Sequence, residues 1–425
     1  MMSDKFIKFR FLSRFLPEES KRRLVVLTGA RQTGKTTLAK SKYSGLNYIN
    51  LDAPENRELL RSITTSSWAA TVRNAVLDEA QKEPSVFEKV KYAFDEGTID
   101  FTVLLGSSQI LLLKKVRESL AGRVGLYELW PLLMCEIAAD AARTDWSPPL
   151  LDRVLDDRPL DDVLRNTAPA LIGEKAEAAL RSEKHLLSWG GMPALLALNG
   201  EEERWKWLKD YEYTYLERDL SDLARLDDLN PFAKFQRLSA LRSGRLINYS
   251  ELARDASVSV DTSRRYLEYL RLSYQVILVQ PFFRNLTSSV VKTPKLYWLD
   301  IGILRRLSGR REESGGEVYE TMVVSEIYKW IRTAQRNVEV YFYRTRSGLE
   351  LDLLLGLEGG RYLGLEVKSR RTVVAKDTRA LKAVADSLGK AWAGGIVVYQ
   401  GDEIKKIADS SIWAVPSRRL FMPAE

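Results

Sequence analysis

The fold is decided by the stretch Arg23-Leu24-Val25-Val26-Leu27-Thr28-Gly29-Ala30-Arg31-Gln32-Thr33-Gly34-Lys35-Thr36-Thr37. It begins as an apolar run typical of a buried strand, and Thr36 to Lys40 is typical of the start of a helix. The glycines therefore fall in the turn between strand and helix, where a Walker A phosphate loop requires them. We expect a P-loop NTPase core on a parallel α/β sheet.

Each residue type in this loop suits a triphosphate. Gly29 and Gly34 let backbone N–H groups fold around the phosphates, and the helix N-terminus adds its positive dipole end. Lys35 is expected to reach the β- and γ-phosphates, and Thr36 to hold Mg²⁺. The predicted nucleotide-binding set, with ATP and Mg²⁺ as cofactors, comprises Gly29, Ala30, Arg31, Gln32, Thr33, Gly34, Lys35, Thr36 and Thr37.

A second apolar run, Asn74 to Leu77, ends in two acids, Asp78 and Glu79. Such a run is also typical of an ordinary strand followed by a solvated turn. Its position after a phosphate loop favours a Walker B element, in which Asp78 orders Mg²⁺ and Glu79 is the general base that polarises the attacking water.

Two further residues are candidates for the same site. Ser107 follows the apolar run Thr102 to Leu105, so it is placed to sense the γ-phosphate; an ordinary turn is the alternative. Arg123 is a candidate arginine finger or sensor, because the transition state of phosphoryl transfer needs a cation. The alternative is a surface arginine, and the sequence leaves open whether Arg123 acts on its own chain or on a neighbour.

Composition limits the classes of function. The excess of 65 Lys and Arg over 57 Asp and Glu, a formal charge of +8, favours polyanionic partners. One cysteine and one histidine exclude an intrachain disulfide and a zinc site, so a catalytic metal must sit on carboxylates. The amino terminus lacks the apolar region of a secretion signal, and no apolar stretch is long enough to span a bilayer. We expect a cytoplasmic protein without a membrane partner.

The pattern of the sequence changes three times along the chain. Short aliphatic runs alternate with helical stretches at first, then helical periodicity dominates, broken by proline and glycine clusters. Three short helical patterns with β-rich runs follow, and the chain closes with a helix and alternating strands. These changes predict a P-loop AAA+ core (1–137), an insert and helical lid (138–230), a winged helix (231–310) and a second α/β domain (311–425).

The third unit has the pattern of a helix-turn-helix. Asn248 to Ala256 and Asp261 to Leu272 are two helical segments separated by a short turn. The second carries Arg264, Arg265 and Arg271, which would contact phosphates or base edges of DNA if this helix entered a major groove. The alternative is a packing module whose arginines form a solvated face.

The last unit carries acids and a lysine in a pattern suited to a metal-dependent reaction. Glu320 lies in a helical segment, Asp352 in a strand, and Glu366 and Lys368 on one face of the next strand, because side chains alternate between faces. Glu320, Asp352 and Glu366 are predicted to bind Mg²⁺, or alternatively Mn²⁺, and Lys368 to activate water against a phosphodiester. Glu350 shares the face of Asp352 and is a further candidate ligand. Glu-x-Lys alone is a weak signal.

Together these motifs resemble a known family. The segments at 29–36, 77–82, 104–108, 119–123, 190–193 and 215–219 are similar to those of prokaryotic AAA+/STAND-type ATPases that carry a C-terminal nuclease-like domain. The resemblance covers nearly the whole chain. It implies that Gly191 to Pro193 closes the lid over the adenine, that Arg218 and Asp219 belong to the lid or a domain junction, and that the last domain has the PD-(D/E)XK, restriction-endonuclease-like fold. A plain turn is the alternative for Gly191 to Pro193.

The leading interpretation is an ATPase coupled to a Mg²⁺-dependent nuclease that acts on or remodels DNA. Its rival is an ATP-dependent regulatory or scaffolding switch, whose nuclease-fold domain is catalytically silent and binds DNA or a protein partner. The sequence leaves open whether the substrate is DNA or RNA, whether the protein forms homo-oligomers, and what the insert at 144–171 does.

Overall fold

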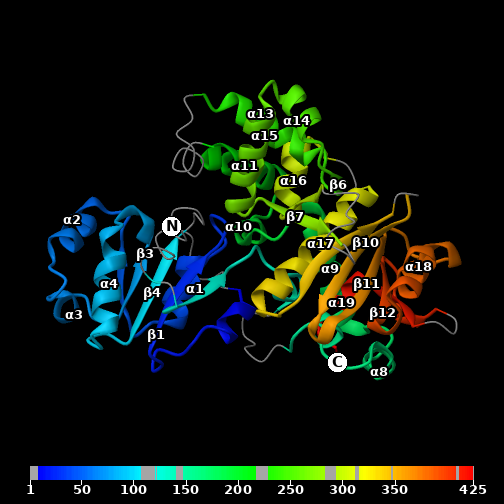
Figure 1. Cartoon of the computed structure of the whole chain (residues 1–425), viewed down its shortest axis with the longest axis horizontal. Helices are drawn as coiled ribbons and strands as arrows, with labels where there is room; N and C mark the ends of the chain where they lie inside the picture. Colours follow the sequence, from blue (N-terminus) through cyan, green and yellow to red (C-terminus); the bar gives the residue numbers. More distant parts are fainter. Residues whose placement is uncertain are drawn as a thin grey trace.

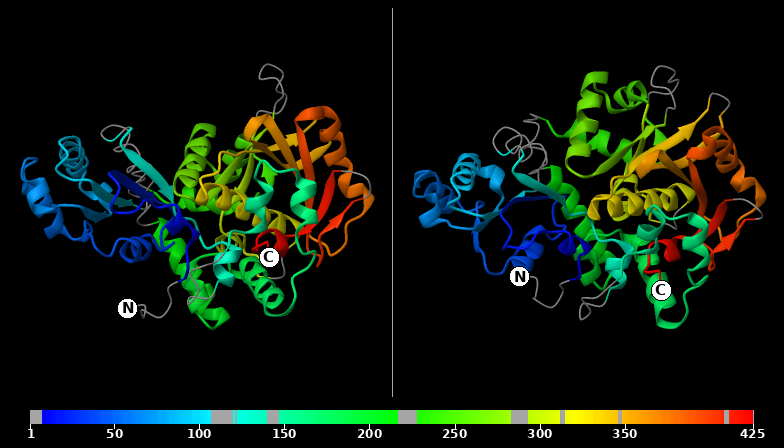
Figure 2. Two further views of the ribbon diagram at one scale, coloured as in Figure 1. Left: turned by 90° about the horizontal axis from the view of Figure 1, so that it is seen from below. Right: turned by 60° about the horizontal axis from the view of Figure 1, so that its bottom comes forward.

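The computed structural model describes residues 8–106, 120, 122–139, 147–216, 228–282, 293–311, 315–345, 348–407 and 411–424. Figure 1 shows an amino-terminal α/β unit at one end of the molecule, a carboxyl-terminal sheet at the other, and a group of helices beside both. In both views of Figure 2 the amino-terminal unit projects from the rest as a lobe.

The amino-terminal lobe is a five-stranded sheet in the order β2-β3-β4-β1-β5, with every pairing parallel. The runs Val25–Leu27, Ala75–Asp78 and Phe101–Gly106 are buried because a parallel sheet is covered on both faces. The predicted parallel α/β core is confirmed. Its strands are β1 (Arg23–Thr28), β2 (Asn47–Asn50), β3 (Ala75–Asp78), β4 (Phe101–Gly106) and β5 (Val124–Glu128). Its helices are η1 (Phe11–Arg14), α1 (Lys35–Lys42), α2 (Pro54–Ser62), α3 (Trp68–Thr71), η2 (Ala80–Lys82) and α4 (Ser85–Asp95).

A helical region follows the sheet. Its helices are α6 (Met134–Ala138), α7 (Leu150–Val154), α8 (Leu160–Arg165), α9 (Gly173–Trp189), α10 (Pro193–Ala197) and α11 (Glu201–Thr214). The described part of the insert packs on the carboxyl-terminal unit: Leu150 N donates to Met422 O at 2.8 Å, and Trp413 Nε1, of the last strand of the sheet, donates to Asp161 Oδ1 at 2.8 Å. This location gives the insert a structural role that the sequence did not reveal.

Four helices and short antiparallel strands come next, over the residues for which the sequence pattern predicted three short helices followed by strands. Three of the helices begin at side-chain caps: Asn248 Oδ1 accepts from Glu251 N, Ser259 Oγ from Thr262 N and Asp300 Oδ1 from Ile303 N, each at 3.1 Å. The elements are α13 (Asn230–Ala240), β6 (Arg245–Leu246), α14 (Tyr249–Ala256), α15 (Val260–Leu272), β7 (Val276–Pro281), β8 (Lys295–Trp298) and α16 (Ile301–Ser308).

The carboxyl-terminal sheet crosses the predicted boundary at residue 310. Gln280 of β7 pairs in parallel with Tyr341, so one nine-stranded sheet has the order β13-β14-β12-β11-β10-β9-β7-β8-β6. Its strands are β9 (Glu339–Arg344), β10 (Glu350–Leu357), β11 (Arg361–Lys368), β12 (Trp392–Tyr399), β13 (Lys405–Lys406) and β14 (Ile412–Pro416). Its helices are α17 (Gly316–Thr333), η4 (Glu358–Gly360), η5 (Ala375–Thr378), α18 (Arg379–Leu388), η6 (Gly389–Ala391) and α19 (Ser417–Leu420).

Helix α17 lies between the two sheets. Most of its residues are buried, and Arg332 near its end donates to Glu128 Oε2 at the end of β5, at 2.7 Å. Lys329 donates to Leu132 O at 3.0 Å. One helix therefore joins the amino-terminal lobe to the larger sheet. None of the helices in the described ranges is both long and apolar enough to cross a membrane.

Candidate functional site

The phosphate loop lies at the carboxyl end of β1, where it turns into α1. Gly29 and Gly34 have φ of 148° and 97°, which glycine adopts without strain. A Cβ at Gly29 would lie 2.1 Å from Leu129 O, so only glycine fits there. The local sequence thus produces the strand, loop and helix expected of a Walker A element.

The lysine and threonine of the loop meet the end of β3. Lys35 Nζ donates to Gly29 O at 3.0 Å and to Ala30 O at 2.8 Å, within the loop itself. Thr36 Oγ1 donates to Asp78 Oδ2 at 2.7 Å, so the predicted Walker A and Walker B residues are in contact. A hydroxyl beside a carboxylate is a set of hard oxygen donors, which fits Mg²⁺.

The acid that directly follows β3, Glu79, is partly buried. Glu79 follows the strand with a φ of 54°, and its Oε2 accepts from Gln81 Nε2 at 2.5 Å. Burial raises the pKa of Glu79 against the opposing effect of Lys35. A carboxylate with a raised pKa is a better proton acceptor at neutral pH, which suits a general base.

Tyr48 is a residue of this site that sequence reasoning missed. Its hydroxyl donates to the same Asp78 Oδ2, at 2.7 Å, and the ammonium of Lys40 lies 3.8 Å from the centroid of its ring. Tyr48 is in β2, the neighbour of β3, where Asn50 is paired with Asp78. A tyrosine in a short polar strand gave no sequence signal, because only the strand order places it there.

Replacing Tyr48 by phenylalanine is expected to raise the Mg²⁺ concentration that half-saturates ATP hydrolysis by roughly three- to tenfold, since a hydrogen bond to a charged carboxylate is lost. Titration of Mg²⁺ in a steady-state ATPase assay measures the shift. Tyr92→Phe, at an exposed tyrosine of α4, is the control. An unchanged Mg²⁺ dependence in Tyr48→Phe would remove Tyr48 from the site.

Arg10 is a second residue that was missed. Its buried guanidinium donates to Thr33 O in the phosphate loop at 2.7 Å, to Trp130 O at 2.5 Å and to Glu136 Oε2 at 3.1 Å. It therefore ties the loop to the segment after β5. No local pattern marks this arginine, because its three partners lie far apart in sequence.

Arg123 lies far from the phosphate loop of its own chain. It precedes β5, where the pairing of Leu24 with Val124 puts it at the amino-terminal edge of the sheet, opposite the loop. Its guanidinium donates to Asp95 at 2.6 and 2.9 Å. A role as arginine finger within its own chain is therefore ruled out by geometry; action on a neighbouring chain stays a prediction. Ser107 lies outside the described residues.

The Gly-Gly-Met-Pro segment is clamped between other elements. Gly191 N donates to Asp300 Oδ2 at 2.7 Å, and Gly191 O accepts from Leu132 N at 2.7 Å. Asp300 is also the N-cap of α16. Pro193 starts α10. These contacts explain the glycines by close packing, and closure over an adenine by Pro193 stays a prediction. Arg218 and Asp219 lie outside the described residues.

The three arginines of α15 differ in their surroundings. Arg264 and Arg265 are exposed, and the guanidinium carbon of Arg264 lies 4.3 Å from the ring centroid of Tyr249. Arg271 is paired with Glu268 at 2.6 Å, so its charge is balanced within the helix. Arg264 and Arg265 are the better placed of the three for a polyanion, and contact with DNA stays a prediction.

Four acids gather on the carboxyl-terminal sheet and α17. We call Glu320, Glu350, Asp352 and Glu366 the carboxylate cluster. Asp352 Oδ2 accepts from Val367 N at 2.8 Å, so β10 and β11 lie side by side as their predicted hairpin requires. Lys368 Nζ donates to Glu366 Oε1 at 2.6 Å. The structure thus brings the four predicted residues Glu320, Asp352, Glu366 and Lys368 into one region.

Two residues from β8 enter this cluster unpredicted. Lys295 Nζ lies 3.7 Å from Glu320 Oε1 and 4.0 Å from Asp352 Oδ1, and it forms an ion pair with Glu350. The hydroxyl of Tyr297 donates to Glu320 Oε1 at 2.7 Å. Among the described residues, no group of three or more His, Cys, Asp or Glu side chains has the arrangement of a metal site.

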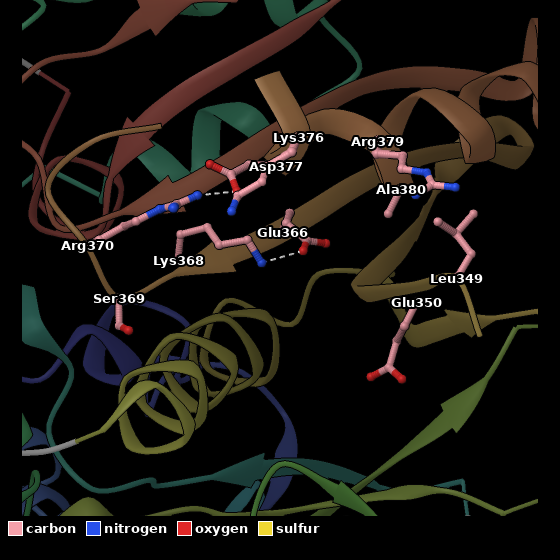
Figure 3. A pocket seen from close by; sticks show the side chains of 10 residues that line it. All are labelled: Leu349, Glu350, Glu366, Lys368, Ser369, Arg370, Lys376, Asp377, Arg379 and Ala380. Atoms are coloured by element: carbon pink, nitrogen blue, oxygen red, sulfur yellow. Dashed lines mark hydrogen bonds and ion pairs between the residues drawn. The ribbon is translucent and has the colours of Figure 1, made fainter. Parts of the chain in front are cut away.

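A cavity of about 560 Å³ opens beside the cluster (Figure 3). Figure 3 shows Lys368 turned toward Glu366, and Arg370 toward Asp377. The basic side chains of its lining come from Lys368, Arg370, Lys376 and Arg379. Glu366 is only 8% exposed, and its Oε2 has no hydrogen-bond partner. An unpartnered buried carboxylate oxygen fits a hard cation, whereas the ammonium of Lys295 beside Glu320 and Asp352 does not.

Burial changes the acidity of this cluster. Burial, and then the neighbouring carboxylate of Asp352, raises the pKa of Glu320 to about 7 and the pKa of Glu366 to about 8. The adjacent lysines oppose both shifts. These two acids are therefore protonated in part near neutral pH.

The raised pKa values predict a pH-dependent stability in the absence of divalent metal. Between the ordinary value of 4.5 and about 8, folded Glu366 binds more protons than unfolded Glu366, so the free energy of unfolding falls as pH rises. Glu366→Gln removes this titration. The free energy of unfolding is measured by denaturant titration in EDTA at pH 5 and at pH 8. Its decrease between the two pH values is expected to be smaller in Glu366→Gln than in wild type, by on the order of 1–3 kcal/mol. Equal losses in both proteins would contradict the assignment.

Three families match successive parts of the chain. Residues 21–138 match the family described as an AAA domain, 181–314 match a domain of unknown function (DUF8612), and 315–420 match another domain of unknown function (DUF4143). Over 407 residues the chain is 27% identical to uncharacterized proteins of Mycobacterium tuberculosis and Mycobacterium bovis, which covers 94% of this chain and 81% of each relative.

Two similar solved structures come from archaea. One is a Walker-type ATPase of Pyrococcus abyssi, with 16% identity, a TM-score of 0.42, and coverage of 70% of this chain and 94% of that one. The other is a STAND protein with a tetratricopeptide repeat sensor from Pyrococcus horikoshii, with 10% identity, a TM-score of 0.26, and coverage of 78% and 48%. Both TM-scores are below 0.5, so these two structures carry no assignment. Residues 21–138 are assigned to a P-loop ATPase domain of the AAA type from the family match and the geometry of the phosphate loop.

Proposed function

We propose that this P-loop ATPase of the AAA type couples ATP hydrolysis to a Mg²⁺-dependent, nuclease-like domain that acts on DNA. In this proposal residues 1–137 are the ATPase core, 138–230 the insert and lid, 231–310 a winged helix and 311–425 the nuclease-like domain. The last two units share one sheet and would move as one body.

The ATPase half of the proposal assigns a role to each residue around the phosphate loop. Lys35 would exchange its bonds to Gly29 O and Ala30 O for the β- and γ-phosphates. Thr36 and Asp78 would hold Mg²⁺, which supplies charge stabilisation to the phosphates when bound. Glu79 would take the proton from the attacking water.

The nuclease half rests on one observation. Glu366 keeps a buried, unpartnered oxygen at the wall of a cavity that also carries four basic side chains. The bases are placed to bind phosphodiester oxygens, and Lys368, held by Glu366, is placed to orient a water. Glu320, Asp352 and Glu366 would be the ligands of the metal, which would supply Lewis-acid activation when bound.

Two contacts support coupling between the halves. Helix α17 carries Glu320 and also Arg332, which is bonded to Glu128 at the end of β5. The hydroxyl of Tyr274, just beyond α15, donates to Thr28 Oγ1 at 3.2 Å, next to the phosphate loop. A nucleotide-dependent movement of the lobe would therefore reach both the winged helix and the carboxylate cluster.

A second function is favoured by a different observation. Lys295 lies among Glu320, Glu350 and Asp352, where a nuclease of this kind would hold metal. This arrangement favours the ATP-dependent regulatory or scaffolding switch, in which the last domain binds DNA or a protein partner without cutting.

A cleavage panel tests the two functions. Purified protein is incubated with single-stranded, duplex and branched DNA and with RNA, with Mg²⁺ or Mn²⁺, in the presence and absence of ATP. Metal-dependent cleavage that is lost in Asp352→Ala supports the nuclease. Coupling is supported if ATP changes the rate of cleavage by the wild-type protein but not by Lys35→Ala. Wild-type protein that cuts no substrate with either metal would refute the nuclease half and leave the switch.

A further inference from the structure

The carboxylate cluster contains a cation that belongs to the protein. The ammonium of Lys295 lies 3.7 Å from Glu320 Oε1 and 4.0 Å from Asp352 Oδ1, and is paired with Glu350. Lys295 is 3% exposed, although lysine is one of the residues most rarely buried. Such a buried lysine is held by its partners, not by solvent.

The position of Lys295 is built by three strands. Lys295 pairs with Val279 of β7, and Pro281 of the same strand pairs with Phe342 of β9. The Lys295 ammonium lies 5.6 Å from the ring centroid of Phe342, a favourable distance for a cation and an aromatic ring. The sheet therefore directs this side chain toward the cluster.

Two of the four acids of the cluster have other cations beside them. Arg344 pairs with Glu350 at 3.1 Å, and Lys368 pairs with Glu366 at 2.6 Å. Within the described part of the chain, Lys295 forms ion pairs with the other two acids, Glu320 and Asp352. Glu320 and Asp352 are only partly exposed, and two neighbouring carboxylates repel each other, so Lys295 has a clear electrostatic role here.

A divalent metal and Lys295 need the same atoms. Mg²⁺ or Mn²⁺ would require carboxylate oxygens at roughly 2.0–2.6 Å, and the Lys295 ammonium already lies within 4.0 Å of Glu320 Oε1 and of Asp352 Oδ1. Two cations at one place also repel each other. This competition agrees with the absence of a metal-type grouping among the described acids.

We propose that Lys295 is a resident cation that competes with a divalent metal for Glu320 and Asp352, so that the carboxylate cluster binds metal only when Lys295 is displaced. The inference rests on the proposed nuclease-like function and names how its metal site is regulated. Strand β8 and Tyr274 both belong to the unit 231–310, and Tyr274 contacts Thr28 beside the phosphate loop. The unit that carries Lys295 therefore also contacts the ATPase lobe.

The test measures Mn²⁺ binding to the full chain without nucleotide, by electron paramagnetic resonance of free Mn²⁺. Lys295→Met and Lys295→Gln are expected to bind Mn²⁺ about tenfold or more tightly than wild type, because the competing charge is gone. Adding Asp352→Asn is expected to abolish this gain. Lys329→Met is the matched control, because Lys329 is equally buried and paired with an acid, Glu326, outside the cluster.

Either of two results overturns the inference. In the first, Mn²⁺ binds in a way that depends on Asp352, but with the same affinity in wild type and in the Lys295 variants. In the second, no protein binds Mn²⁺ in a way that depends on Asp352. Thermal unfolding checks that the variants fold. A second measurement uses wild-type protein alone: acetylation of Lys295, followed by mass spectrometry, is expected to rise several-fold with Mn²⁺ if metal displaces the lysine. An unchanged acetylation would contradict the proposal.

The cleavage panel keeps the two proposals distinguishable. If Lys295→Met gains Asp352-dependent Mn²⁺ binding but cuts no nucleic acid, the resident cation stands and the nuclease fails. If wild type cuts DNA and Lys295→Met binds Mn²⁺ no more tightly than wild type, the nuclease stands and the resident cation fails.

Discussion

Lys35→Ala is expected to lower the turnover of ATP by roughly 10²–10³-fold. Lys35 is the cation of the phosphate loop, and its ammonium already lies in the loop, bonded to Gly29 O and Ala30 O. Without it, the negative charge that builds up on the transferred phosphoryl group loses a positioned partner. Steady-state phosphate release at saturating Mg²⁺ and ATP measures the effect.

The control for this prediction lies on the same helix. Lys42 is at the end of α1 and pairs with Glu18 at 2.6 Å, so Lys42→Ala removes a lysine of α1 without touching the loop. It is expected to retain turnover within about twofold of wild type. A Lys35→Ala protein that hydrolyses ATP as fast as Lys42→Ala would show that Gly29 to Thr36 is not the catalytic phosphate loop.

Asp352→Asn is expected to abolish metal-dependent cleavage, by on the order of 10³-fold, and to leave ATP turnover unchanged. Asparagine keeps the shape of the side chain, so the acceptor of the Val367 N–H is retained while the charge that would bind metal is lost. A gel assay on the substrate that wild type cuts, together with phosphate release, separates the two activities.

Asp386→Asn is the matched control, because Asp386 is an exposed acid on α18 of the same unit. It is expected to cut at the wild-type rate. Cleavage that survives Asp352→Asn at full rate would point to a contaminating nuclease or to a different site. A loss of ATP turnover in Asp352→Asn would instead indicate that the variant has disturbed α17 and its contact with β5.

Patterns within short segments predicted much of this molecule. The alternation of apolar runs and helices predicted the parallel sheet, and the glycines between β1 and α1 predicted the phosphate loop. The Glu-x-Lys spacing placed Glu366 and Lys368 on one face of β11, where they are bonded. These predictions succeeded because each depends on residues that are neighbours in sequence or belong to adjacent elements.

Predictions that needed the packing of distant elements fared differently. Arg123 follows the motifs of the nucleotide site closely in sequence but lies at the opposite edge of the sheet, because a parallel strand begins where its neighbours begin. The predicted border at residue 310 is crossed by one continuous sheet. No local periodicity reports which strand becomes the neighbour of which.

The sequence by itself determined the phosphate loop, the acids Asp78 and Glu79 and the candidate acids of the carboxylate cluster. Each of these was recognisable from the residue types and their spacing within a short segment. Only the tertiary structure decided that Tyr48 contacts Asp78, that Arg10 holds the phosphate loop and that Lys295 enters the cluster. The physical reason is that strand order and register bring side chains together across the sheet, and these depend on packing of the whole chain. The phosphate loop that defines the ATPase is therefore local, whereas the access of metal to the carboxylate cluster is a property of the assembled sheet.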